Sequence, residues 1–128
     1  MSTFVQIGKK FTPADGVSPV TVVSPGPTEG YLVSLFRVRF LMQTVKSDGL
    51  ERVMTVKVVS PGRDTISVVE VPLFIADNLT TIDLIPFLSN TGNFGLSNPD
   101  SITVEVDEAV DASDELTLQG FSIAGGEA

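Results

Sequence analysis

Apolar and polar residues alternate with a period of two along most of this sequence, whereas the spacing of an amphipathic helix is almost absent. The clearest stretch is Ser101 to Val106 (SITVEV), which has one apolar and one polar face when it is extended. Such segments predict β-strands. Further segments of this kind, most of them rich in β-branched residues, cover 3–7, 17–23, 52–59, 65–71 and 116–123.

Turn signals separate these segments. Asp15-Gly16 and Asp48-Gly49 are compact turn pairs, and the phrase Val-Val-Ser-Pro-Gly occurs at 22–26 and again at 58–62. A chain of 128 residues suffices for one hydrophobic core and is short for two. We therefore predict a single all-β domain over 1–128, a two-sheet antiparallel β-sandwich of seven to nine strands with jelly-roll or Ig-like topology.

The longest extended segment is Tyr31 to Val45, which as one strand would span about 50 Å and must bend or pass between the sheets. Its even positions are predicted to face the core, and its odd positions mix apolar side chains with Arg37 and Arg39. Such a mixture is typical of protein–protein interfaces, and the alternative is a second buried face whose arginines reach the sheet edge. The even row is Leu32, Phe36, Val38, Phe40 and Met42, and the interface candidates of the odd row are Tyr31, Val33, Leu35, Arg37 and Arg39.

Two later segments are less regular. Leu79 to Leu88 contains Pro86, which favours a short helical turn or an edge strand. Ser89 to Asp100 is rich in Gly and Asn and predicts a long loop, with Phe94 as a sixth interface candidate.

The sequence contains no Cys and no His. This excludes disulfides, thiol nucleophiles, Cys- or His-ligated metals and every triad that needs His. Glu105 and Asp107 have the spacing of paired carboxylates but few aromatic residues accompany them, and Gly8-Lys9-Lys10 lacks the glycines of a phosphate-binding loop. We expect no enzyme activity, no cofactor and no bound metal.

Charge divides the chain into two parts. All eight basic residues lie within the first 63 positions, whereas the twelve acidic residues from Asp64 onward have no basic neighbour in that half. The carboxylates could be solvated, could face the basic half of this chain or of a neighbour, or could bind calcium, although EF-hand spacing is missing. The proposed basic partners are Arg37, Arg39, Arg52 and Arg63, and the acidic cluster is Glu105, Asp107, Glu108, Asp111, Asp114 and Glu115.

An acidic β-chain free of Cys and His and without a signal peptide resembles, in composition and strand pattern, the small virion accessory proteins that decorate or cement the capsids of tailed bacteriophages. The resemblance implies a structural or assembly protein of the virion, made in the host cytoplasm, with a capsid or other assembly protein as its partner. It also implies a homo-oligomer, which could be a trimer. Nucleic acid and membrane are not expected partners. The alternative function is a non-catalytic carbohydrate-binding or adhesion module.

Overall fold

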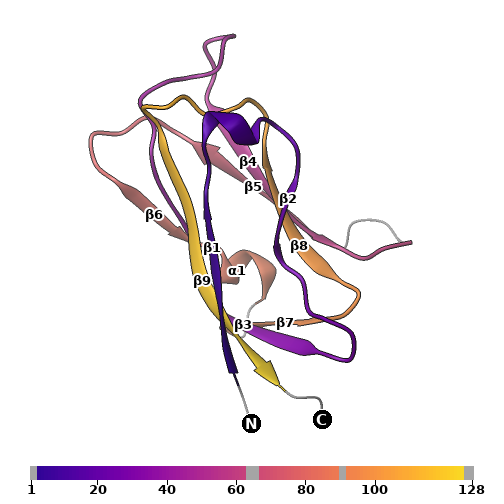
Figure 1. Ribbon diagram of the computed structural model, residues 1–128. Helices are drawn as coiled ribbons and strands as arrows, with labels where there is room; N and C mark the ends of the chain where they lie inside the picture. Colours follow the sequence, from indigo (N-terminus) through magenta and orange to yellow (C-terminus); the bar gives the residue numbers. More distant parts are fainter. Residues whose placement is uncertain (1–2, 63–66, 90–91, 126–128) are drawn as a thin grey trace.

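The computed structural model describes residues 3–62, 67–89 and 92–125, and within them the chain forms an antiparallel β-sandwich of nine strands (Figure 1). The predicted fold class is confirmed. The strands are β1 (Thr3–Lys10), β2 (Val20–Val23), β3 (Gly30–Leu41), β4 (Arg52–Val59), β5 (Ser67–Leu73), β6 (Thr80–Asp83), β7 (Phe94–Ser97), β8 (Ser101–Val106) and β9 (Glu115–Gly125), with a 3-10 turn η1 (Pro13–Asp15) and a short helix α1 (Ile85–Leu88).

Strands from the two ends of the chain alternate within each sheet. The first sheet, which we call sheet A, has the order β1-β9-β3-β6, with β7 pairing the other half of β3, and sheet B has the order β2-β8-β4-β5. An Ig-like sheet would place the first two strands side by side, but here β1 and β2 lie in different sheets. The strand order is therefore the jelly-roll alternative.

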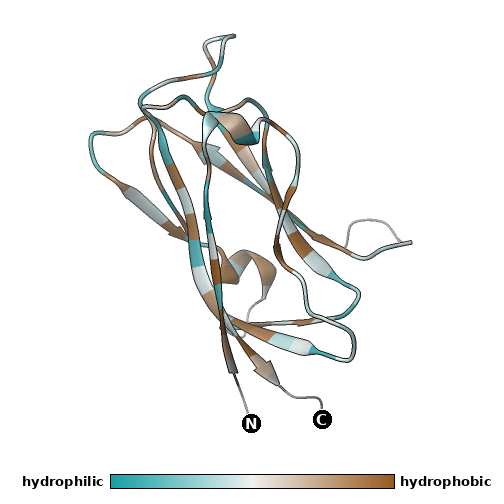
Figure 2. Cartoon of the chain, viewed as in Figure 1, coloured by the Kyte–Doolittle hydropathy of each residue, from teal (hydrophilic) through white to brown (hydrophobic). Residues whose placement is uncertain are grey.

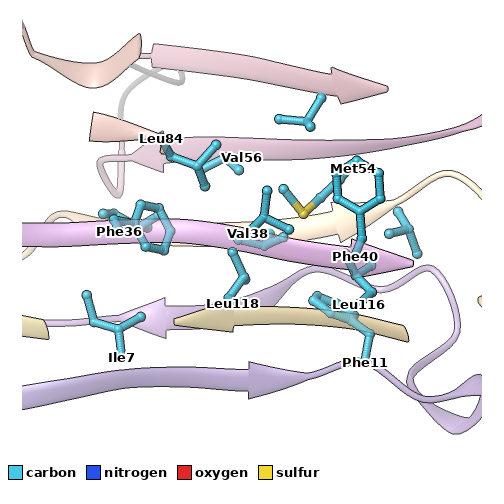
Figure 3. Close-up of a cluster of buried hydrophobic side chains, with 14 of the residues drawn as sticks. Ile7, Phe11, Phe36, Val38, Phe40, Met54, Val56, Leu84, Leu116 and Leu118 are labelled. Atoms are coloured by element: carbon cyan, nitrogen blue, oxygen red, sulfur yellow. The ribbon is translucent and has the colours of Figure 1, made fainter. Parts of the chain in front are cut away.

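The core lies between the sheets and consists of the inward rows that alternation predicts. Phe36, Val38 and Phe40 of β3 lie beside Leu116 and Leu118 of β9 and meet sheet B side chains such as Met54 and Val56 (Figure 3). Hydrophobic and hydrophilic colours accordingly alternate along β8 and β9 (Figure 2). In β8 of sheet B, the three residues that alternation predicts to face the core are all buried, namely Ile102, Val104 and Val106.

A bulge in β3 changes which side chains face the core. The register against β9 shifts between Val33 and Leu35, so Ser34 is an extra residue. The predicted even row is correct from Phe36 onward but wrong for Leu32, which is 38% exposed, while Val33 is fully buried. The bulge is possible because Gly120 lies opposite, where a Cβ atom would overlap the carbonyl group of Leu35.

The two less regular segments, 79–88 and 89–100, contain short elements of secondary structure. Leu79 to Leu88 contains both the edge strand β6 and the helical turn α1, whose Leu84 N–H donates to the Phe36 carbonyl over 2.8 Å. The predicted loop Ser89 to Asp100 contains strand β7, so the loop prediction is wrong there, and its residues 90 and 91 lie outside the described residues. In the part of the chain that the structure describes, no helix is long and apolar enough to cross a membrane.

Candidate functional site

The connection between β8 and β9 lies at the end of the sandwich away from the start of β1 and the end of β9 (Figure 1). Asp114, the last residue of this connection, is the centre of a polar cluster. Its carboxylate is fully buried and accepts hydrogen bonds from the backbone N–H groups of Gln43, Thr44 and Asp111 and from the Thr44 hydroxyl, at 2.7–3.0 Å. Burial by itself would raise the pKa of Asp114, but these donors outweigh it and the pKa lies below its ordinary value. The carboxylate is therefore ionised and saturated by its own chain.

Arg52 provides the positive charge of this cluster and is only 4% exposed. Its guanidinium lies 3.5 Å from Asp114 and 3.7 Å from Glu108, and it donates to the carbonyl oxygens of Thr44 and Ala109 at 2.9–3.2 Å. We call Arg52, Thr44, Glu108, Ala109 and Asp114 the Arg52 cluster. It fixes the 107–114 connection against the segment that follows β3.

The neighbouring acids are also paired within the chain. Asp107 accepts from the Val53 N–H at 2.9 Å and lies 3.0 Å from the Lys46 ammonium, and Glu105 lies 2.9 Å from Lys57. Burial opposes the ionisation of Asp107, but the Val53 and Lys46 contacts prevail and its pKa is lowered. The interpretation of the acidic cluster as a merely solvated face is wrong for these carboxylates, which face the basic half of the same chain.

No group of three or more acidic side chains among the described residues is arranged to hold a metal ion. The carboxylate oxygens that could have coordinated calcium accept backbone N–H groups instead: Ser47 donates to Glu108, and Ser113 donates to Asp111. The paired carboxylates Glu105 and Asp107 are each occupied by a lysine.

The cations that remain unpaired occupy one surface. Of the seven basic residues that the structure describes, Lys9, Lys46, Arg52 and Lys57 form ion pairs. Lys10, Arg37 and Arg39 form none within 3–62, 67–89 and 92–125, and all three lie on the outer face of sheet A. The fourth proposed arginine, Arg63, lies outside the described residues.

The outer face of sheet A also carries apolar side chains. Register places Phe4, Ile123 and Leu32 in one row across β1, β9 and β3, and it places Gln6, Phe121 and Leu35 in the next. The Phe4 ring contacts the edge of Phe121 at a centroid distance of 5.5 Å, although Phe4 is 72% exposed. We call this surface the sheet A outer face, defined by Phe4, Leu32, Leu35, Phe121 and Ile123 with Lys10, Arg37 and Arg39.

A hollow of about 660 Å³ lies in this face between β1, β9 and β3. Gly8 and Gly120 form part of its floor, and Leu35, Phe121 and the amides of Gln6 and Gln119 line its sides. Arg37 donates from Nε to Gln119 Oε1 over 3.3 Å, and Gln119 is one of the residues that line the hollow. The hollow therefore has apolar lining residues, and Arg37 lies beside it; Lys9, which also lines it, is paired with Asp15.

The outer face of sheet B differs in composition. Threonines and the Lys57–Glu105 ion pair occupy its central strands β4 and β8, and the exposed Val68 lies on the edge strand β5. This is the ordinary wet face of an antiparallel sheet.

The six interface candidates divide into two groups. Leu35, Arg37 and Arg39 lie on the sheet A outer face, while the prediction that Tyr31 and Val33 share that face is wrong, because the bulge turns both toward the core. Phe94 begins β7 and packs against the core. Sequence reasoning missed Phe4, Phe121 and Ile123. A signal was present in β9, where the apolar row changes from Leu116 and Leu118 to Phe121 and Ile123.

A second, smaller hollow of about 300 Å³ lies beside α1, next to the bulge. It is lined by Ser34, Asp83, Ile85, Pro86, Ser89 and Gly92. The Asp83 carboxylate there accepts the Ile85 N–H at 3.1 Å.

The sequence matches no protein-family model, and no curated protein is significantly similar to it. The surfaces described above are therefore the guide to its function.

Proposed function

We propose that this protein is a structural or assembly protein that acts through protein–protein contacts made by the sheet A outer face. The observation that carries the proposal is the coincidence, on that face, of exposed apolar side chains with the three cations that form no ion pair among the described residues. Exposed apolar residues beside arginine are typical of interfaces, and a contiguous apolar patch on a soluble domain needs an explanation.

The jelly-roll strand order agrees with this proposal, because capsid proteins use the fold. Together with the resemblance to phage decoration and cement proteins, it favours a virion as the location and a capsid or other assembly protein as the partner. Copies of this chain could contact one another in the same assembly. The fold also occurs in lectins and other proteins, so the sheet A outer face supports the proposal more strongly than the fold does.

A non-catalytic carbohydrate-binding or adhesion module is the second candidate, favoured by the hollow beside α1. Its Ser34, Asp83 and Ser89 side chains are of the kind that bind sugar hydroxyls, and it borders the Ser89 to Asp100 segment. A glycan array would test this: a sugar retained by the wild type and lost in Asp83→Asn would support the second candidate over the first.

Co-sedimentation in an extract of the source tests the assembly proposal. We expect tagged wild-type protein to sediment with a large particle, and Leu35→Glu to remain at the top of the gradient. Val68→Glu is the matched control because it places the same charge on the other sheet, at a residue that is 54% exposed. Sedimentation of all three proteins as free monomers would contradict the proposal.

A further inference from the structure

Gly8 has no structural reason within the chain to lack a side chain. It lies in the middle of β1, its φ is not positive, and nothing lies within 4 Å of the position that its Cβ would take. Gly120 differs, because a Cβ there would overlap the Leu35 backbone. Glycine weakens a strand interior, and one with open space above it marks a place where another molecule can approach closely.

The surroundings of Gly8 indicate the chemistry of that molecule. Gly8 pairs with Gln119, which pairs with Arg37, while Lys10 and Arg39 flank Thr117 in the adjacent row. Adjacent strands are about 4.8 Å apart, so the three cations lie within one short region of the face. Asp83 is the register partner of Arg37 in β6 but forms no ion pair with it among the described residues.

A second copy of this chain fits this region poorly. Four of the six carboxylates of the acidic cluster, Glu105, Asp107, Glu108 and Asp114, are paired with Lys57, Lys46 and Arg52 of their own chain. The same face of a second copy carries three cations, Lys10, Arg37 and Arg39, against two carboxylates, Asp83 and Glu115, so it would bring net positive charge to this region. Among the described residues on the outer face of sheet B, Glu105 is paired with Lys57, and Glu70 is the carboxylate that remains.

We infer that the hollow over Gly8 receives an apolar side chain from an acidic segment of a different protein, whose carboxylates contact Lys10, Arg37 and Arg39. This inference rests on the proposed function and specifies its partner. Leu35 and Phe121, which line the hollow, contact the inserted side chain, and Arg37, bonded to the lining residue Gln119, provides a charge beside the hollow. The apolar contact supplies affinity, and the charges supply orientation and selectivity for acidic partners.

The test uses two synthetic peptides of equal length, one alternating Leu with Glu and the other alternating Leu with Gln, titrated into the full chain and followed by backbone amide NMR. We expect the Glu peptide to shift the amides of Gly8, Gln119 and Arg37. Its affinity should fall about tenfold in the Arg37→Gln, Arg39→Gln double variant, because two partly exposed ion pairs are lost. Lys57→Gln, on sheet B, is the matched control and should bind as the wild type does.

Gly8→Val separates the hollow from the charges. The substitution adds a β-branched residue where space is open, so the protein should melt at the same temperature or higher while peptide affinity is lost. Binding should also weaken between about 50 mM and about 500 mM salt, because the pairs are screened.

Four results would overturn the inference: equal binding of the two peptides, no binding of either, self-association of the wild type through this face, or stronger shifts of the same amides by a single-stranded oligonucleotide. None of these by itself overturns the proposed function, which depends on the co-sedimentation of wild type and Leu35→Glu.

Discussion

The Arg52 cluster and the sheet A outer face are opposites in how they use their side chains. The cluster buries two charged groups and gives each one several partners, whereas the face leaves Phe4 mostly exposed and three cations without an ion pair among the described residues. The cluster closes one end of the sandwich, and the apolar rows of the face lie toward the end that carries the termini (Figure 1).

The difference shows that charge in a sequence does not by itself indicate a binding surface. Most carboxylates of the acidic cluster accept hydrogen bonds or form ion pairs that hold loops of the same chain together. A buried carboxylate is tolerated only when donors surround it. The surface available to a partner is the one whose groups the fold leaves unsatisfied. The following predictions test this contrast between a stabilising region and a contacting region.

Deleting the Asp114 carboxylate should have the largest effect. Asp114→Ala leaves Arg52 buried without its closest charge and leaves three backbone N–H groups without an acceptor, so we expect a loss of about 3–5 kcal/mol in the free energy of unfolding. Urea denaturation measures it. Asp111→Ala, in the same loop but exposed, should cost less than about 1 kcal/mol. Equal losses for the two variants would show that the cluster is not a stabilising unit.

Gly120→Ala should have the next largest effect. Its methyl group would overlap the Leu35 carbonyl and displace the bulge, with a cost of about 1–3 kcal/mol. Gly8→Ala is the matched control in the paired strand and should be neutral or slightly stabilising. If Gly120→Ala is as stable as the wild type, the bulge does not depend on the close approach of Gly120 to the Leu35 backbone.

Acid should weaken the cluster by a smaller amount. The pKa of Asp114 and that of Asp107 lie below their ordinary value of 3.8, so each contributes stability that is complete above that value. This stability is lost as pH falls through the lowered pKa of the folded state. Chemical denaturation between pH 7 and pH 2 should show the decline, and Asp114→Asn should show a shallower one. If stability falls equally with pH in the wild type and in Asp114→Asn, the Asp114 carboxylate is not a source of the acid sensitivity.

Substitutions on the sheet A outer face should change stability least. Phe4→Ser and its counterpart Val68→Ser on sheet B should each lie within about 0.5 kcal/mol of the wild type, because both side chains are mostly exposed. Only Phe4→Ser should reduce co-sedimentation with the particle. Thermal melting and gradient sedimentation check the two parts, and equal sedimentation of both variants would place the contact elsewhere.

Part of the sheet A outer face could be predicted from the sequence, but the full set of residues that form it could not. Leu35, Arg37 and Arg39 were predicted because they alternate with buried neighbours in an extended strand. Phe4 could not be assigned, since both rows of 3–7 contain apolar residues and the local pattern does not say which one meets sheet B. The hollow could not be predicted either, because it forms between residues far apart in the chain.

The sequence by itself determined the all-β class, the strand Arg52–Val59 and the core row from Phe36 onward, because side-chain alternation along an extended chain is a local property. Tertiary structure decided the rest. Whether Leu32 or Val33 is buried depends on a bulge that the distant Gly120 permits, and whether Asp114 is a ligand, a solvated charge or a structural acceptor depends on Arg52 and Thr44, brought to it by the packing of separate strands. A bulge reverses every side chain beyond it and a buried charge needs partners in space, and neither requirement is expressed in the neighbouring sequence.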